Sequence, residues 1–249
     1  MSVRLLLINP NTSTAITDLV VSAAREFASP GTTIAGATGR FGARYIATRA
    51  AAAVAAHATL DAYAAHAQDA DVVILACFGD PGLAGLKELS HQPVVGMAEA
   101  ACYYASTLGR RFGIVTGGAR WGPMLDEFVR SIGLSERLAG IKTVAPSGAD
   151  IARDPERAHA MLVDASNALV EECEADSVIL GGAGLARIAA QIAERVSVPL
   201  IDAVGAAVKA AEALGNLGPS KARVGSFAQT PAVETVGLAA ALAARMEGR

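Results

Sequence analysis

Two stretches of this sequence share one apolar run but end it with chemically different residues. Residues 70–83 read ADVVILACFGDPGL, and residues 175–188 read ADSVILGGAGLARI. They agree from Ala-Asp through Val-Ile-Leu, after which Cys77 stands in the first where Gly182 stands in the second. A thiol can remove a proton from an acidic carbon or return one, whereas glycine has no side chain to do either. The pattern predicts a proton-transfer group in one half of the chain and none at the matching place in the other.

The residues around Cys77 favour a chemical role over simple packing. A free cysteine after a strand is by default a buried core residue, but the turn that follows Cys77 contains Gly79 and Gly82, which let backbone N–H groups approach an anionic oxygen. We expect Cys77 at a strand-to-helix junction, where the helix N-terminus lowers the pKa of the thiol. It should then be alkylated faster than Cys102 and Cys173, for which we keep the packing interpretation.

The elements that must position these residues follow from the hydrophobic pattern. Short apolar runs alternate with longer Ala/Leu-rich segments of helical period, which is typical of βα units on buried parallel sheets. The runs predicted as strands are RLLLI, TTIAGA, DVVILA, PVVGM, RFGIV, GIKTV, SVILGG and VPLID. The predicted helices span residues 16–28, 45–68, 155–173 and 231–246, and two of them follow capping residues, Asn-Thr-Ser in one case and Asp154 in the other.

The second half of the chain repeats the first. Residues that flank predicted strands recur in matching pairs: Arg4 and Arg111, Asp71 and Asp176, Pro93 and Pro199. Their offsets are 107, 105 and 106 residues, and three matches at a nearly constant offset indicate a duplicated arrangement. The repeat predicts an α/β fold of two similar Rossmann-like lobes, each with a parallel sheet, related by pseudo-twofold symmetry.

The repeat also predicts the domain boundaries and the place of the active site. The first lobe is expected to hold residues 1–97 plus 204–249, and the second residues 98–203. Ligands of open parallel sheets bind beyond the carboxyl ends of the strands. We therefore expect the active site in the cleft between the lobes, with Cys77 and Gly182 on opposite walls.

Composition limits the classes of function that fit. Of 249 residues, 52% are hydrophobic and 18% are charged, and the net charge of −3 comes with scattered Lys and Arg residues. Such a chain can bury a large core, but it has no electrostatic footprint for nucleic acid or an anionic membrane, so we expect a small-molecule substrate. The N-terminal apolar run is too short for a signal peptide or a membrane span, and the three cysteines lack zinc-site spacing. We expect a cytoplasmic protein with no metal.

Four motifs together resemble a known family, the Asp/Glu/hydantoin racemase superfamily, nearest to its hydantoin and allantoin racemase branch. The motifs are INPNTS at 8–13, CFGDPGL at 77–83, VVGMAEAA at 94–101 and GIVTGG at 113–118. The resemblance implies a racemase that works without a cofactor and moves a proton at a carbon next to a carbonyl, with one cysteine from each lobe. The family's second cysteine sits in a Gly-Cys-Ala-Gly turn, which here reads Gly-Gly-Ala-Gly at 181–184.

The resemblance also implies the site residues and an assembly. Cys77 is expected to be catalytic, and Gly182 to stand at the position of the second catalytic cysteine. The substrate-binding residues are expected to be Asn11, Ile46, Phe78, Gly79, Thr116, Gly117, Gly182 and Ala183. The family resemblance also implies that the protein assembles as a homo-oligomer.

Several alternatives stay open at the level of the sequence. The chain could be an isomerase of a hydantoin, allantoin or amino acid in which water or another residue replaces the second thiol. It could be a single-cysteine decarboxylase of the arylmalonate type, where loss of CO₂ makes the enolate and Cys77 protonates it, or a binding protein that has lost turnover. Asn9, Pro10 and Asn11 could cap a helix or contact ligand. Asp80 could cap the helix after the cysteine turn or contact substrate, and we expect the capping role.

Overall fold

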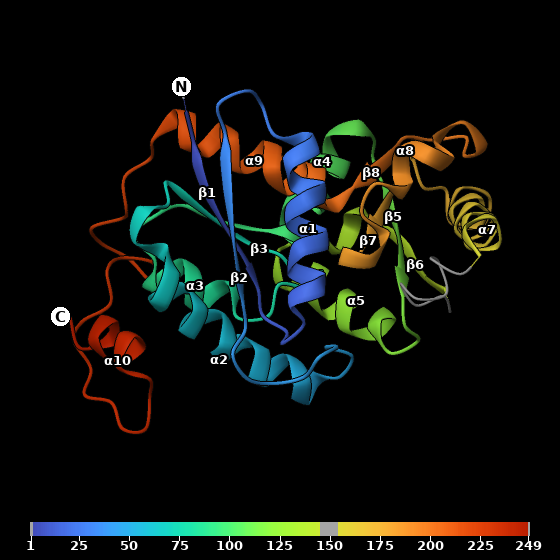
Figure 1. Ribbon diagram of the computed structural model, residues 1–249. Coiled ribbons are helices and arrows are strands. Elements are labelled where there is room, and N and C mark those ends of the chain that lie inside the picture. Colours follow the sequence, from blue (N-terminus) through green and yellow to red (C-terminus); the bar gives the residue numbers. More distant parts are fainter. Residues whose placement is uncertain (1, 145–153, 249) are drawn as a thin grey trace. The chain divides into compact units, whose positions relative to one another are not determined.

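The computed structural model describes residues 2–144 and 154–248. Within them the chain forms two four-stranded parallel sheets (Figure 1). It divides into a first unit, Met1–Gly96 with Val208–Arg249, and a second unit, Met97–Ala207. The predicted α/β class with two parallel sheets is confirmed.

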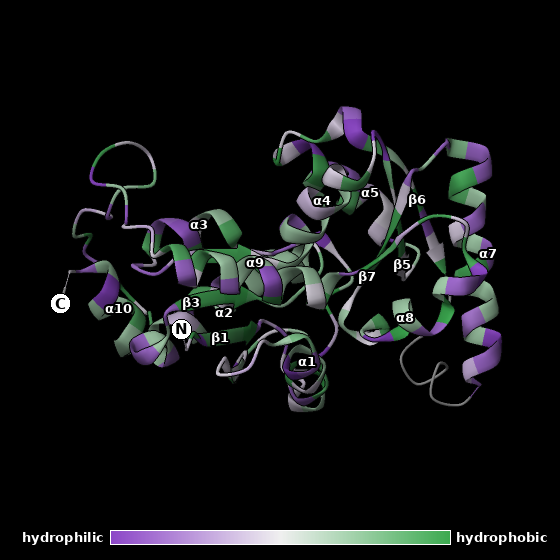
Figure 2. Cartoon of the chain, turned by 90° about the horizontal axis from the view of Figure 1, so that it is seen from above, coloured by the Kyte–Doolittle hydropathy of each residue, from purple (hydrophilic) through white to green (hydrophobic). Residues whose placement is uncertain are grey.

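The first sheet has the order β2-β1-β3-β4. Its strands are β1 (Arg4–Asn9), β2 (Thr33–Thr38), β3 (Val72–Leu75) and β4 (Val94–Gly96), and every neighbouring pair is parallel. The central strands β1 and β3 are apolar and buried, and Figure 2 shows both in green. When both faces of a strand are covered, the side chains on both faces are apolar, so apolar and polar residues do not alternate. The apolar residues of β1 and β3 are therefore consecutive in the sequence.

Helices cover both faces of this sheet. From β1 the chain crosses to β2 on one side and then back past β1 to β3, so right-handed crossovers put the two connecting helices on opposite faces. The helices of this unit are α1 (Thr14–Phe27), α2 (Arg49–His66), which continues in a short 3-10 turn, α3 (Leu83–Leu89) and α10 (Ala240–Met246). The last of them packs against α2.

The second unit has the same strand order, β6-β5-β7-β8. Its strands are β5 (Phe112–Gly117), β6 (Leu138–Val144), β7 (Ser177–Gly181) and β8 (Leu200–Asp202). Its helices are α4 (Met97–Leu108), α5 (Trp121–Ser131), α7 (Pro155–Cys173) and α8 (Ile188–Ile192), while α9 (Ala203–Leu217) begins here and continues into the first unit. Green and purple segments alternate along α7 in Figure 2, as expected for a helix with one buried face.

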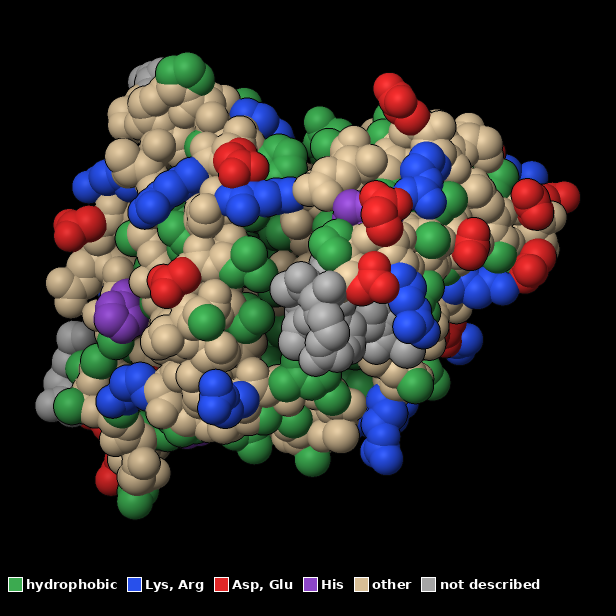
Figure 3. Space-filling model, turned by 45° about the vertical axis from the view of Figure 1, so that its right-hand side comes forward, with side chains coloured by type: hydrophobic (Ala, Val, Ile, Leu, Met, Phe, Trp, Pro, Cys, Tyr) green, Lys and Arg blue, Asp and Glu red, His purple; other side chains and the backbone are tan. Residues whose placement is uncertain are grey.

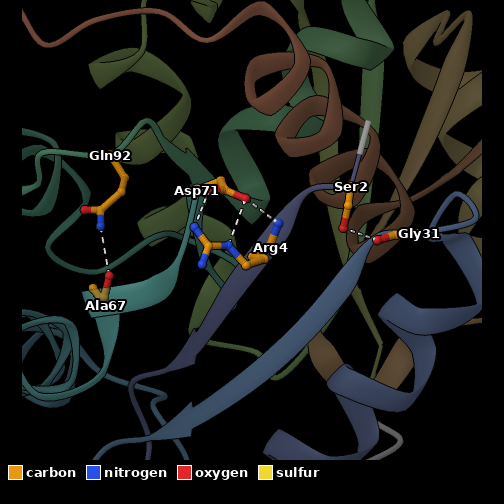
Figure 4. Close-up of polar contacts among 6 residues, drawn as sticks. All are labelled: Ser2, Arg4, Gly31, Ala67, Asp71 and Gln92. Carbon is orange, nitrogen blue, oxygen red and sulfur yellow. Dashed lines mark hydrogen bonds and ion pairs between the residues drawn. The ribbon is translucent and has the colours of Figure 1, made fainter.

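The residues that marked the repeat make equivalent hydrogen bonds in the two units. Asp71 N–H donates to Arg4 O, and Asp176 N–H donates to Arg111 O, both at 2.8 Å. Each aspartate carboxylate accepts in return from the N–H of its arginine, at 2.8 Å and 2.9 Å. The Arg4 guanidinium adds an ion pair to Asp71 of 2.9 Å (Figure 4).

The repeated proline also has one structural role in both units. Pro93 O accepts from Val73 N–H and Pro199 O from Val178 N–H, each at 3.0 Å. Proline is tolerated at the start of these strands because its missing N–H is not needed there. The internal repeat predicted from the sequence is therefore a repeat of hydrogen-bond pattern as well as of strand order.

Two predicted helix boundaries are wrong. The helix expected over 45–68 begins at Arg49, because Thr48 caps it by accepting a 3.1 Å hydrogen bond from Ala51 N–H. The helix expected over 231–246 begins at Ala240, after Gly237, whose positive φ of 78° is incompatible with a continuing right-handed helix. Among the described residues, no helix combines the length and apolar character needed to cross a membrane.

Candidate functional site

Two asparagines occupy the carboxyl end of β1. Asn9 is fully buried, and its Nδ2 donates to Asn11 Oδ1 at 2.9 Å and to Thr17 Oγ1 at 3.0 Å. Asn11 Oδ1 also accepts from Ser13 N–H at 2.8 Å, which holds the turn into α1. No described residue accepts a hydrogen bond from Asn11 Nδ2, so its side chain keeps a donor available at this edge of the sheet.

Ile46 lies in the β2–α2 loop, defined here as residues 39–48. This loop leaves the carboxyl end of β2 and contacts the turn after β1, where Thr12 N–H donates to Ala43 O at 3.2 Å. Ile46 is 3% exposed, so the surrounding residues cover nearly all of it and fix its place in the loop.

The turn after β3 does not place Cys77 at a helix N-terminus. Gly79, Asp80 and Gly82 all have positive φ, of 108°, 45° and 86°, and such a backbone cannot continue into a helix. The helix α3 begins only at Leu83, six residues after Cys77. Its N-cap is Gly82, and the first helical N–H, that of Leu83, donates to Asp80 O at 3.1 Å.

The environment of Cys77 raises the pKa of its thiol to about 12. Desolvation by the surrounding protein is the main cause, and the Asp80 carboxylate adds to it, because both disfavour a thiolate. The residue as a whole is half-buried, so it keeps some contact with solvent although its sulfur is closely surrounded by protein. The pKa shift is opposite in sign to the one the sequence predicted, and the thiol of the free protein is protonated at neutral pH.

Backbone donors accompany the thiol. The turn is closed by a 2.9 Å hydrogen bond from Asp80 N–H to Cys77 O, while the N–H groups of Phe78 and Gly79 donate to no described residue. The Phe78 ring is 5% exposed and packs into the unit. Two adjacent unused N–H groups beside a thiol can stabilise a negatively charged oxygen.

The second unit contributes Thr116, Gly117, Gly182 and Ala183. Thr116 is buried at the end of β5, and its Oγ1 donates to Gly181 O at 2.7 Å. Gly182 follows β7 with φ of 128°, and Ala183 begins the next 3-10 turn. A Cβ added at Gly182 would find only Thr116 Oγ1 within 4 Å, at 3.9 Å, so the position is open but its backbone is strained for any other residue.

Cys77 and Gly182 are structural equivalents within the two units. Leu185 N–H donates to Gly182 O at 3.0 Å, which repeats the Asp80-to-Cys77 hydrogen bond of the first unit. Both residues follow the third strand of their sheet in chain order, β3 or β7. The alignment of the two stretches in the sequence therefore corresponds to one turn built twice.

The predicted site residues form two groups at the carboxyl ends of the two sheets. The first unit holds Asn11, Ile46, Cys77, Phe78 and Gly79, and the second holds Thr116, Gly117, Gly182 and Ala183. Sequence reasoning missed the pair formed by Arg40 and the buried Asp61. The available signal was that Asp61 is the sole acidic residue of an Ala-rich helix.

The charged side chains form no basic surface on the face drawn in Figure 3. Blue Lys and Arg side chains alternate there with red Asp and Glu. Among the residues the structure describes, no three His, Cys, Asp or Glu side chains are grouped so that they could hold a metal ion.

Comparisons with known proteins agree on one family. The sequence profile of the family described as Asp/Glu/Hydantoin racemase matches residues 5–211. The chain is 33% identical to a hydantoin racemase of Pseudomonas sp. (strain NS671) over 235 residues, covering 94% of each chain. It is 36% identical to a hydantoin racemase of Paenarthrobacter aurescens over 226 residues, covering 90% of this chain and 96% of that one. The crystal structure of allantoin racemase from Pseudomonas fluorescens superimposes with a TM-score of 0.90 at 35% identity, covering 94% of this chain and all of that one.

Proposed function

Because the chain belongs to the Asp/Glu/Hydantoin racemase family, we propose that it is a racemase or isomerase that moves a proton at a carbon next to a carbonyl. The substrate class is a hydantoin, allantoin or a related amino-acid derivative. The observation that carries this proposal is the Cys77 thiol in its turn at the carboxyl end of the first sheet, next to unused backbone donors.

Cys77 is the proton-transfer group of the proposal. With its pKa raised to about 12, the thiol carries its proton at neutral pH and is ready to act as an acid toward an enolate. The reverse step, removal of the substrate proton, requires a lower pKa, which polar groups of a bound substrate near the sulfur can bring about. The N–H groups of Phe78 and Gly79 hold the enolate oxygen while the carbon is planar.

Gly182 limits the proposal to one thiol. Gly182 is the equivalent of Cys77 in the second unit and has no side chain, so the opposite face of the substrate carbon needs another proton donor. The open space beside Gly182 suits a water molecule in that role. General acid–base groups typically contribute about 10²–10⁴-fold, so inversion should be slower than proton exchange by a factor in that range.

A second candidate is a single-cysteine decarboxylase of the arylmalonate type. The same Gly182 favours it, because loss of CO₂ creates the enolate without a base and Cys77 then protonates one face only. In that reaction the proton on the thiol goes to the carbon, and solvent reprotonates the sulfur.

Proton exchange in D₂O tests the proposal. Enantiopure 5-substituted hydantoins and allantoin would be followed by NMR for deuterium uptake and by polarimetry for inversion, and arylmalonates for CO₂ release. We expect fast deuterium uptake into the enantiomer whose C–H faces Cys77, slow inversion, and poor exchange of the opposite enantiomer. Cys77→Ala should abolish all of these, whereas Cys173→Ser should leave them unchanged.

Each outcome is decisive. Equal, rapid exchange and inversion of both enantiomers would show that a second proton-transfer group exists despite Gly182. Release of CO₂ from arylmalonates without exchange of hydantoins would favour the decarboxylase. If a protein shown to be folded has neither activity, both proposals are refuted.

A further inference from the structure

The β2–α2 loop, which carries Ile46, is tied to its surroundings at both ends. At its start, Gly39 N–H donates to Asn9 O at 2.8 Å, and in its middle Ala43 O accepts from Thr12 N–H. At its end, Thr48 caps α2. These contacts connect the loop to the turn after β1 and to the helix that follows it.

One ion pair crosses from this loop to α2. Arg40 Nε donates to Asp61 Oδ2 at 2.8 Å, and Arg40 Nη2 donates to Asp61 Oδ1 at 2.6 Å. The Asp61 side chain is 2% exposed, while that of Arg40 is 57% exposed. A bidentate guanidinium–carboxylate pair fixes orientation as well as distance. The loop also places Phe41 edge-on against His57 of α2, with ring centroids 4.8 Å apart.

The same helix contacts the cysteine turn. Thr59 Oγ1 donates to Pro81 O at 3.0 Å, only two residues before Asp61 in the helix. Gly82 lies directly on α2, because a Cβ at Gly82 would come within 2.9 Å of Ala56 Cα. The helix α2 therefore contacts both the turn that carries Cys77 and the loop that carries Ile46, and supports the two together.

We propose that Arg40, acting through Asp61, is a positioning residue that fixes the β2–α2 loop so that Ile46 lines the substrate pocket beside Cys77. The inference rests on the proposed function. It follows from the juxtaposition of a buried carboxylate on α2, a bidentate arginine in the loop, and the cysteine turn on the same helix. A rigid support that presents both the apolar contact and the thiol removes the cost of ordering the loop when substrate binds.

The effect should appear in KM. An apolar contact from Ile46 acts on substrate and transition state alike, so loosening it raises KM and leaves kcat nearly unchanged. Partial unfolding would do the reverse, because it lowers the amount of active enzyme without changing KM. The two explanations therefore separate in a single kinetic experiment.

Three variants and one matched control define the test. Arg40→Met removes the clamp but leaves the buried Asp61 carboxylate unpaired, which is itself destabilising. Arg40→Met with Asp61→Asn removes both charges and keeps the shape of the side chain on α2. Arg40→Lys keeps the charge without the bidentate geometry. The control is Arg4→Met, which breaks a second bidentate pair, with Asp71, at the amino end of the same sheet (Figure 4).

The measurements are KM and kcat for the best hydantoin, the melting temperature, and hydrogen exchange of residues 39–48. We expect the Arg40→Met and double variants to raise KM by about 10-fold with kcat within about 3-fold of the original, and to speed amide exchange in the loop by about 10-fold or more. Arg40→Lys should fall between them and the original protein. Arg4→Met should lower the melting temperature without changing KM or the exchange of this loop.

The proposal is overturned if the double variant recovers KM together with stability, because Arg40 would then only neutralise Asp61. It is equally overturned if loop exchange is unchanged. If the original protein acts on no hydantoin, allantoin or related amino-acid derivative, the proposed function fails by itself. In that case the amide hydrogen exchange of residues 39–48 in the Arg40 variants still tests whether Arg40 fixes the loop.

Discussion

At the scale of single residues, the thiol of Cys77 departs most from what its sequence context predicts. The glycines of the turn give the backbone positive φ angles, so α3 begins only at Leu83, six residues after Cys77. Burial and the neighbouring Asp80 then raise the pKa of the thiol. The Cys77 thiol is therefore protonated in the free protein at neutral pH.

This protonation has a measurable consequence. Because the thiolate is the species that attacks iodoacetamide, Cys77 in the folded protein should react slowly at pH 7, and its rate should rise about 10-fold per pH unit toward a midpoint at about 12. Mass spectrometry of alkylated peptides over pH 7–10 measures this rate. A substrate analogue that polarises the thiol should speed the reaction or, if it covers the sulfur, block it. Labelling that is already complete within seconds at pH 7 would contradict the raised pKa.

Gly182 sets a limit on rebuilding the second thiol. Gly182→Cys has room for its Cβ, but a φ of 128° is one that a cysteine adopts only at a cost of about 1–3 kcal/mol. We expect the variant to gain inversion relative to one-sided exchange while its melting temperature falls. Gly182→Ala is the matched control, since it carries the same strain without the sulfur. If both variants invert hydantoins at the original rate, Gly182 does not occupy the second proton-transfer position.

At the scale of elements, α9 is joined to the loop after α1 by one buried carboxylate. Glu212 is 6% exposed and accepts hydrogen bonds from Ser29 N–H at 2.6 Å, Thr32 Oγ1 at 2.7 Å and Lys209 Nζ at 2.9 Å. Burial opposes its ionisation, but these donors prevail and lower its pKa to about 2. The carboxylate therefore stabilises the packing of α9 on the first unit only while it is ionised.

The pH dependence follows from the sign of this shift. A carboxyl group whose pKa is lower in the folded than in the unfolded protein contributes stability above its ordinary pKa of 4.5, and that stability is lost as pH falls toward about 2. Glu212→Gln should lower the free energy of unfolding by about 1–3 kcal/mol at pH 7 and flatten its decline below pH 4.5. Urea unfolding at pH 7, 4 and 3 measures both effects. Asp18→Asn, at an exposed position on α1, serves as the control. A variant that loses as much stability at pH 3 as at pH 7 would contradict this assignment.

At the scale of the whole molecule, the chain is one arrangement built twice, and the two copies should respond separately. Asp71 and Asp176 play the same part in different units. Replacing each with Asn should lower the free energy of unfolding by about 0.5–1.5 kcal/mol, because exposed backbone donors exchange a charged acceptor for a neutral one. The double variant should show the sum within about 0.5 kcal/mol in urea unfolding. A coupling above about 1 kcal/mol would show that the units do not respond independently.

Much of the fold was predictable because its signals are local. Continuous apolar runs such as VVIL at β3 predict buried parallel strands, and Asp154 with Pro155 predicts the start of α7, where the side chain accepts from Arg157 N–H. The boundaries that failed lie where a single capping or glycine residue overrides an Ala-rich pattern, at Thr48 and Gly237. Helical propensity summed over a window is insensitive to such single residues.

The amino-acid sequence by itself determined the two parallel sheets, the repeat that pairs Cys77 with Gly182, and the family. These depend on strand periodicity and on a few residues at fixed offsets, which are properties of the chain read in order. Only the tertiary structure decided the protonation of Cys77 and the pairing of Arg40 with Asp61. Both depend on which groups surround a side chain in space, because desolvation and ion pairing act over a few ångströms regardless of separation along the chain.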